Sequence, residues 1–229
     1  MNKKLLLSII LSIIILSLVI FLVIKNNNKE YEKNEKDIFN NSKKEETDNN
    51  ESINKNPSNK TLVVYFSMAG EVYNVGNVEV GNTALVASYM SDYLNADLFE
   101  IIPSKNYTRV YKDLIKVAKE EQKKNERPQI KNKIDNFEKY DTVFIGYPIW
   151  WGDLPQILYT FLEEYNFDNK TIIPFNTHEG SGSSGTYNTI KNKLTNANVN
   201  INGLSLQGKN ARTDNGKEQT INWLKKLGY

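Results

Sequence analysis

The strongest constraint on the fold is the run Thr142–Asp153, with the sequence TVFIGYPIWWGD. Its apolar part, Val143 to Ile145, is short and rich in β-branched and aromatic residues, and it stops at Gly146, which is typical of a buried strand. A proline and two adjacent tryptophans follow at once. Two neighbouring tryptophans are costly to leave in water, so they either fold back onto the core or stack on a flat ligand. We therefore interpret residues 147–153 as a ligand loop.

Strand and helix patterns alternate along the chain from Thr61 onward. The strands are expected at residues 62–66, 97–102, 140–147, 171–175 and 199–206. The helices are expected at residues 83–94, 107–124, 155–165, 186–195 and 216–226, with Asn82 as an N-cap. This alternation predicts an α/β fold: a doubly wound, five-stranded parallel sheet with helices on both faces. Right-handed crossovers then bring the carboxyl ends of all strands to one edge of the sheet.

The N-terminal part has a different organisation. Residues 1–4 are a short basic start, and Leu5–Ile24 is an uncharged apolar run. At about 1.5 Å per residue such a helix spans the roughly 30 Å hydrocarbon core of a bilayer. No small-residue cleavage pattern follows it, so we predict a transmembrane signal anchor rather than a cleaved signal peptide. Residues 25–60 are polar and too poor in apolar side chains to offset the entropy of ordering, which predicts a disordered linker.

The orientation of the predicted anchor is set only weakly by charge, because lysines flank both of its ends. The short basic start followed directly by the apolar run is similar to an export signal. We therefore expect the folded domain at residues 61–229 to lie outside the cytoplasmic membrane.

Composition excludes several kinds of site. The chain contains no cysteine, which excludes disulfides, thiolate catalysis and cysteine-based metal centres. His178 is the only histidine, so a site with several histidine ligands is excluded as well. The net charge is +2, and basic and acidic residues are interspersed without a basic stripe. We therefore expect no nucleic-acid partner.

Three loops follow strands at the same predicted edge of the sheet. The first, from Ser67 to Thr83, contains no Lys or Arg and offers hydroxyls, backbone amides and a helix N-terminus, which together can bind an anion. Taken alone, the stretch is more typical of an ordinary turn between a strand and a helix, with Asn82 as the cap. The second holds Trp150 and Trp151, one of which can instead pack beneath its own loop. The third, residues 177–186, has glycines that allow close approach to a ligand, or that simply form a flexible turn. Because all three loops lie at the same edge of the predicted sheet, we expect them to form one shared ligand site.

Several motifs occur together in the order found in a known family. They are Ser67…Gly70…Asn82-Thr83, residues 119–123 with Arg127-Pro128, residues 134–141, residues 146–152 (GYPIWWG) and residues 175–182 (FNTHEGSG). In this combination residues 61–229 resemble the flavodoxin-like family. The resemblance implies a sheet of order 2-1-3-4-5 and a non-covalent FMN at the point where the strand order reverses.

The resemblance also implies which residues contact FMN. The phosphate would be held by Ser67, Ala69, Gly70, Asn82 and Thr83. The flavin ring would be lined by Tyr147, Pro148, Ile149, Trp150, Trp151 and Gly152. Its other side would be closed by Thr177, His178, Glu179, Gly180, Ser181 and Gly182. Two features depart from the family pattern: the membrane anchor, and an insertion at residues 71–81 that bears most on Ala69 and Gly70. Tyr73 in this insertion either covers the site or is exposed.

Three functions remain open at the level of sequence. The first is a membrane-tethered electron carrier that docks redox proteins. The second is an FMN-dependent NAD(P)H:quinone-type oxidoreductase with a small quinone-like acceptor. The third is a tethered binding module without flavin. We assign no catalytic residue: His178 is expected in the site without a proton-transfer role, and Asp153 and Glu179 are expected to disfavour an anionic reduced flavin by repulsion. The sequence leaves the electron donor and acceptor and the oligomeric state open.

Overall fold

The computed structural model describes residues 60–229. The predicted basic start, the predicted membrane anchor at residues 5–24 and all but the last residue of the predicted linker therefore lie outside the described residues. Within residues 60–229, no helix combines the length and the apolar character needed to cross a membrane.

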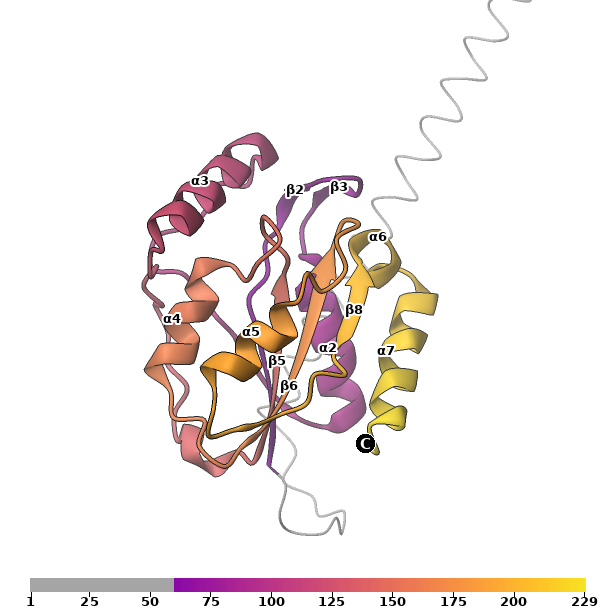
Figure 1. Cartoon of the computed structure of the whole chain (residues 1–229). Helices are drawn as coiled ribbons and strands as arrows, with labels where there is room; N and C mark the ends of the chain where they lie inside the picture. Colours follow the sequence, from indigo (N-terminus) through magenta and orange to yellow (C-terminus); the bar gives the residue numbers. More distant parts are fainter. Residues whose placement is uncertain (1–59) are drawn as a thin grey trace, which may run out of the picture. The chain divides into compact units, whose positions relative to one another are not determined.

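A parallel β-sheet forms the centre of the described domain (Figure 1). Its strand order is β4-β1-β5-β6-β7, and β8 also pairs with β6. In chain order this is 2-1-3-4-5, as predicted, with β7 and β8 sharing the fifth position. The strands are β1 (Thr61–Tyr65), β4 (Asp97–Glu100), β5 (Thr142–Pro148), β6 (Thr171–His178), β7 (Asn198–Val199) and β8 (Leu204–Gln207).

The fifth strand, predicted as one segment at residues 199–206, is in fact split. β7 pairs with Thr171 and Ile172, whereas β8 pairs with β6 only from Phe175 onward. Pro174 lies in β6 opposite the gap, and proline has no N–H to donate to a neighbouring strand. The hydrogen bonding between β6 and the fifth strand is therefore interrupted at Pro174, between β7 and β8.

Helices cover both faces of the sheet. They are α2 (Asn82–Leu94), α3 (Tyr111–Lys124), α4 (Gln156–Glu164), α5 (Thr186–Lys193), α6 (Gly208–Ala211) and α7 (Asp214–Lys226), with a 3-10 helix, η2, at Phe137–Lys139. The helix predicted at residues 107–124 begins only at Tyr111, and α6 and η2 were not predicted.

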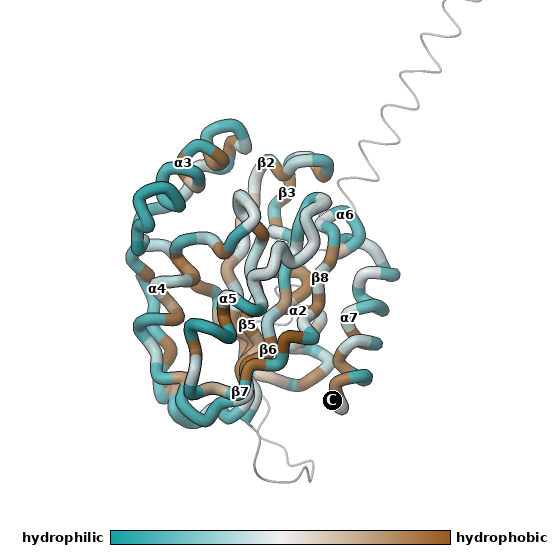
Figure 2. The backbone as a smooth tube through the Cα atoms, viewed as in Figure 1, coloured by the Kyte–Doolittle hydropathy of each residue, from teal (hydrophilic) through white to brown (hydrophobic). Residues whose placement is uncertain are grey.

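The two faces of the sheet bury separate apolar clusters. Val63 and Tyr65 of β1 pack with α2 and α7, whereas Leu62 and Val64 pack in the cluster that includes α4 and α5. Side chains of a strand point alternately to opposite faces, so β1 must be apolar throughout to fill both layers. Figure 2 shows the corresponding hydrophobic interior strands and the hydrophilic outer surface of the helices.

A small antiparallel hairpin, β2 (Gly70–Val72) and β3 (Gly76–Val78), occupies most of the insertion at residues 71–81. The Glu71 amide donates a 2.8 Å hydrogen bond to the Arg109 carbonyl, just before α3. Gly70 has a φ of +112°, and a Cβ on it would lie 2.5 Å from the same carbonyl oxygen. Glycine is therefore required where the hairpin begins, and the hairpin lies against the start of α3.

Candidate functional site

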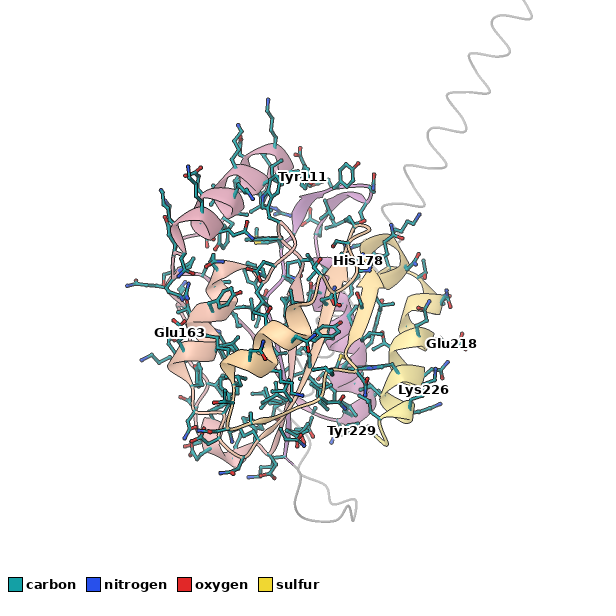
Figure 3. All side chains as sticks on the ribbon, viewed as in Figure 1. Tyr111, Glu163, His178, Glu218, Lys226 and Tyr229 are labelled. Atoms are coloured by element: carbon teal, nitrogen blue, oxygen red, sulfur yellow. The ribbon has the colours of Figure 1, made fainter. Side chains whose placement is uncertain are left out.

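A cavity of about 280 Å³ lies where β1, β5 and β6 end. Its walls come from the ends of these strands and the loops that follow them, from the N-terminus of α2, from β2 with the turn after it, and from α3. Figure 3 shows His178, the last residue of β6, and Tyr111, the first residue of α3, at the same end of the domain. The structure thus brings the three predicted ligand loops together, and α3 adds a wall that the sequence did not predict.

The polar corner of the cavity is built from Ser67 and the N-terminus of α2. Gly81, not Asn82, is the N-cap of this helix, which corrects the prediction. The Ala84 amide in the first turn donates a 3.1 Å hydrogen bond to Ser67 Oγ, so a serine distant in sequence supplies the capping oxygen. A Cβ on Gly81 would lie 2.2 Å from Ser67 Oγ. The insertion therefore returns the chain to Ser67 and preserves the contact between this loop and α2.

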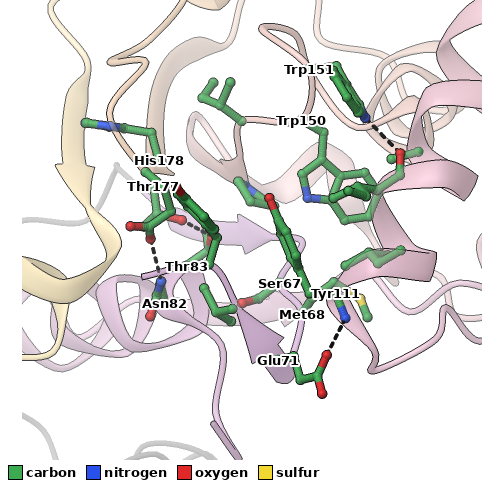
Figure 4. Close-up of a pocket in the computed structure, with 18 residues that line it drawn as sticks. Ser67, Met68, Glu71, Asn82, Thr83, Tyr111, Trp150, Trp151, Thr177 and His178 are labelled. Carbon is green, nitrogen blue, oxygen red and sulfur yellow. Dashed lines mark hydrogen bonds between the residues drawn. The ribbon is translucent and has the colours of Figure 1, made fainter. Parts of the chain in front are cut away.

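Two threonines join α2 to the end of β6. The hydroxyls of Thr83 and Thr177 lie 2.8 Å apart, and either can be the donor. Both side chains are almost completely buried, at 1% and 3% exposure. This contact fixes the first loop and the third loop relative to each other in the cavity wall (Figure 4).

Asn82 is held by two long-range partners. Its Nδ2 donates to Glu179 Oε1 over 3.4 Å, and its Oδ1 accepts a 2.8 Å hydrogen bond from Arg212 Nη1. Arg212 is buried and also donates to the Val80 carbonyl at 3.0 Å. A cation therefore lies behind the N-terminus of α2, although the loop itself contains none. No local pattern in the sequence marks Arg212, because it is 130 residues from Asn82.

Two neighbouring titratable side chains in the third loop have shifted pKa values. Burial raises the pKa of Glu179 to about 7, against the opposing effects of the Gly208 amide and Lys209. Burial lowers the pKa of His178, and its Nδ1 accepts a 2.9 Å hydrogen bond from the Gly180 amide. This assigns the proton of the neutral imidazole to Nε2. Near neutral pH the loop thus presents an uncharged imidazole and a carboxyl group close to its titration midpoint.

The two tryptophans of the second loop pack on different partners. Trp150 makes edge contacts with Phe66 and Tyr107, at centroid distances of 5.4 and 5.3 Å. Trp151 is half exposed, and its Nε1 donates a 2.8 Å hydrogen bond to the Ile115 carbonyl of α3. Figure 4 shows Trp151 directed toward α3 and Trp150 placed deeper along the cavity. Trp150 is therefore better placed than Trp151 to contact a ligand.

A further side of the cavity comes from the hairpin, which belongs to the first predicted loop, and from α3, which the sequence did not place at the site. Glu71 Oε2 accepts a 2.9 Å hydrogen bond from the Tyr111 amide, and the rings of Tyr73 and Tyr111 stack at 5.8 Å with an interplanar angle of 22°. The added lining residues are Met68, Glu71, Val72, Tyr73, Tyr111, Leu114, Ile115 and Ala118. The last four follow the i, i+3, i+4, i+7 spacing of one helix face, which was a usable signal in the sequence.

Comparison with known proteins places this geometry in a family. The family model for flavodoxin matches residues 60–227. The chain belongs to the flavodoxin family. A protein of Bacteroides eggerthii DSM 20697, assigned as a flavoprotein, is 30% identical, with a TM-score of 0.56 over 74% of this chain and 98% of that one. One from Bacteroides uniformis ATCC 8492, also assigned as a flavoprotein, is 28% identical, with a TM-score of 0.59 over 73% and 99%.

A flavoprotein of Lactobacillus acidophilus NCFM, solved in complex with FMN, shares the fold of this flavodoxin domain. It is 20% identical, with a TM-score of 0.50 over 66% of this chain and 93% of that one. A search of curated proteins found no match.

The predicted contact residues of the flavodoxin site divide into two sets. Those in the cavity wall are Ser67, Asn82, Thr83, Pro148, Ile149, Trp150, Trp151, Thr177, His178 and Glu179. The structure does not bring Ala69, Gly70, Tyr147, Gly152, Gly180, Ser181 or Gly182 into that wall. The insertion explains Gly70, which starts β2 against Arg109. Tyr147 is fully buried, and its hydroxyl lies 2.9 Å from Thr186 Oγ1 in the core.

Proposed function

We propose that the flavodoxin domain binds FMN non-covalently in this cavity and serves as a membrane-tethered electron-transfer protein. One observation carries the proposal: a polar corner at the N-terminus of α2 and an apolar wall at Trp150 belong to the same cavity. A phosphate ester attached to a flat ring system needs both features in this proximity.

The residues present fit the phosphate of FMN. The N-terminus of a helix is favourable for anions because its first amides lack intrahelical partners and the helix dipole is positive there. The side chains of Ser67, Asn82 and Thr83 surround this end of α2. The guanidinium of Arg212, held on Asn82 Oδ1, adds positive charge behind the corner.

The residues present also fit the ring of FMN. Ile149 and Trp150 offer apolar surface on the side of β5, and Thr177 and His178 lie on the side of β6. Figure 4 shows Trp150 and the pair Thr177–His178 on opposite sides of the cavity. A flat ring placed between them would lose contact with water on most of its surface, which stabilises it by apolar burial.

Bound FMN supplies the one- and two-electron chemistry, and the protein determines its environment. The apolar wall at Trp150 favours a flat ring. The carboxyl group of Glu179, when ionised, disfavours added negative charge nearby. Both effects act through residues that line the cavity, so we expect them to change the midpoint potential without participating in bond making.

The electron-transfer role has a direct test. The full-length chain, loaded with FMN and reduced anaerobically by light with EDTA as the electron donor, is mixed with oxidised cytochrome c. We expect rapid reduction of the cytochrome, and no consumption of NADH or NADPH above that of a flavin-free sample. A loaded protein that stays reduced in the presence of the cytochrome would contradict the carrier function.

A second candidate is an FMN-dependent oxidoreductase that acts on a small acceptor. The aromatic residues Tyr73 and Tyr111 favour the oxidoreductase, because they cover one side of the cavity. An electron carrier needs only an accessible edge of its cofactor and has no need for such a cover. Steady-state oxidation of NADH or NADPH in the presence of a quinone would distinguish this enzyme from the carrier.

The tether and the location of the domain are supported by the apolar run at residues 5–24 and its basic start. We propose that this run holds the protein in the cell membrane and that the flavodoxin domain lies outside the cytoplasm. Protease added to intact cells should digest the domain. Protection of the domain in intact cells, together with digestion after lysis, would contradict this orientation.

A further inference from the structure

The two stretches of chain that lead into and out of α3 form a narrow neck. They pair as an antiparallel bridge between Pro103 and Ile130. Beside this bridge the Lys131 amide donates a 2.7 Å hydrogen bond to the Ile102 carbonyl. Residues 104–129, which include α3, therefore form one excursion from the body of the domain, and the two ends of this excursion are bound to each other.

The hairpin β2–β3 is joined to the beginning of α3. The Glu71 amide donates to the Arg109 carbonyl at 2.8 Å, and the Glu71 carboxylate accepts from the Tyr111 amide at 2.9 Å. The rings of Tyr73 and Tyr111 stack at 5.8 Å. Figure 1 shows the hairpin and α3 at the same end of the domain. These contacts make the hairpin and α3 one unit, which we call the outer wall of the cavity.

Little of the outer wall is buried. In α3 the buried residues are Leu114, Ala118 and Glu121, and in the hairpin they are Gly70 and Val78. Segments with few buried apolar contacts open at a low cost in free energy, while the core around them stays folded. The outer wall can therefore move as a unit without disturbing the sheet beneath it.

Trp151 connects the outer wall to the loop after β5. Its indole Nε1 donates a 2.8 Å hydrogen bond to the Ile115 carbonyl, and its own carbonyl accepts a 3.3 Å hydrogen bond from Gln122 Nε2. Lys119 Nζ lies 4.7 Å from the centroid of the indole ring. Figure 4 shows Trp151 directed toward α3. All three contacts therefore hold α3 to this loop.

The backbone at Trp151 is one that a tryptophan disfavours. The φ angles are +52° at Trp151 and +75° at Gly152, and the amides of Trp150 and Asp153 each donate to the other's carbonyl at 3.0 Å. This is a two-residue turn with positive φ at both positions, for which asparagine and glycine are best suited. The turn alone gives no reason for a tryptophan, whereas the contacts of its side chain with α3 do.

We propose that the outer wall is a lid over the FMN cavity and that Trp151 holds this lid closed, so that release of Trp151 controls how fast FMN enters and leaves. The inference rests on the proposed FMN-binding function. With the lid closed the cavity has about 280 Å³, just below the range of about 300–1,000 Å³ that is typical of small-molecule sites. Outward movement of the lid gives a ligand of the size of FMN the room to enter.

The test is a stopped-flow measurement of FMN association and dissociation with the full-length chain. Trp151→Asn removes the indole and supplies a residue that suits the turn. If FMN passes only through the open form, both rate constants should rise about fivefold, as expected for one lost hydrogen bond, and the Kd should stay within about twofold. Gln122→Ala should also raise both rate constants, although Gln122 does not line the cavity.

Trp223→Phe is the matched control. The Trp223 indole also donates a 2.8 Å hydrogen bond to a backbone carbonyl, that of Asn202, outside the cavity wall. This variant should leave both rate constants unchanged. The proposal is overturned if Trp151→Asn has the rate constants of the wild type, or if Trp223→Phe raises them equally. A rise in the dissociation rate constant alone would show that Trp151 contacts FMN directly instead of holding a lid.

Hydrogen exchange of the flavin-free chain separates the lid from the proposed function. Trp151→Asn should speed the exchange of the α3 amides about fivefold and leave that of β5 and β6 unchanged, because only the lid opens more often. If the wild type binds no FMN, the proposed function fails, yet this exchange result would still support the lid. Unchanged exchange in α3 would overturn the lid even if FMN binds.

Discussion

Thr83 and Thr177 are 94 residues apart in sequence, yet their hydroxyls lie 2.8 Å from each other in the cavity wall. Thr83 lies in the first turn of α2, and Thr177 lies near the end of β6. Their contact therefore joins the loop proposed to bind the phosphate of FMN to the loop proposed to close one side of the flavin ring. Because both side chains are buried, loss of either hydroxyl leaves the other without its partner.

Valine at either threonine position tests this coupling. Thr83→Val or Thr177→Val should lower the free energy of unfolding by about 1–3 kcal/mol, the cost of an unsatisfied buried hydroxyl. The double variant should recover part of that stability, since no orphan hydroxyl remains, while its FMN affinity stays low. Urea unfolding and FMN titration of the four proteins form the cycle. Strictly additive losses of stability would contradict a direct interaction.

Gly81 is the position where the insertion returns to the first loop, and it has no room for a side chain. A Cβ there would lie 2.2 Å from Ser67 Oγ and 2.4 Å from the Met68 carbonyl oxygen. Gly81→Ala should therefore push Ser67 off α2 and weaken FMN binding by about tenfold or more, as expected for loss of a charge-assisted hydrogen bond. Ala69→Ser is the control, because Ala69 lies outside the cavity wall. If Gly81→Ala binds FMN as tightly as the wild type, Ser67 does not contribute to phosphate binding.

The titration of Glu179 should make FMN binding depend on pH. Its pKa is raised to about 7 chiefly by burial, so in the folded protein it loses its charge as the pH falls below 7. An ionised Glu179 on Asn82 would repel a phosphate at α2, so we expect the Kd for FMN to rise between about pH 6 and pH 8, by up to about tenfold.

Glu179→Gln separates this effect from the ionisation of the phosphate itself, which also occurs near pH 6. The variant keeps an acceptor oxygen for Asn82 but cannot ionise, so its Kd should change less with pH than that of the wild type. Parallel pH profiles for the two proteins would contradict a role for Glu179.

The same shift has a consequence for stability. Because the pKa of Glu179 is higher in the folded than in the unfolded chain, the folded state binds more protons between about pH 4.5 and pH 7. The contribution of this residue to stability should therefore fall as the pH rises through this window. Urea unfolding of the wild type and of Glu179→Gln at pH 4.5 and pH 7 measures this contribution to stability. If the contribution of Glu179 rises with pH instead, the raised pKa of the buried carboxyl is not its cause.

The two adjacent tryptophans should respond differently to substitution. Trp150 packs edge-on against Phe66 and Tyr107, whereas Trp151 is half exposed and bound to α3. Trp150→Leu should lower stability by about 2–4 kcal/mol and weaken FMN binding. Trp151→Leu should cost only about 1 kcal/mol, the value of one hydrogen bond. If Trp151→Leu loses more FMN affinity than Trp150→Leu, then Trp151 and not Trp150 contacts the flavin ring.

The parallel sheet could be predicted because each strand is a short apolar run followed by a helical pattern. The strand order came from the resemblance to the flavodoxin-like family, not from these patterns. The split of the fifth strand could not be read from residues 199–206 alone, because Pro174 in the neighbouring strand interrupts the pairing. The hairpin was missed because β2 and β3 have three residues each and few apolar side chains.

The three loops of the site could be located because strand ends meet at one edge. The sequence could not show which residues of each loop reach the cavity. The insertion places Gly70 in β2, and the Tyr147 side chain points into the core. The wall at α3 was partly predictable from the helical spacing of residues 111, 114, 115 and 118. The contact of Arg212 with Asn82 is a purely tertiary one, so no local pattern could have predicted it.

The most direct test of the account is the absorption spectrum of the full-length chain after incubation with FMN and removal of free flavin. We predict flavin absorption bands at one FMN per chain in the wild type, and their loss in Gly81→Ala. A folded wild-type protein without these bands would contradict FMN binding and leave the flavin-free binding module as the remaining function.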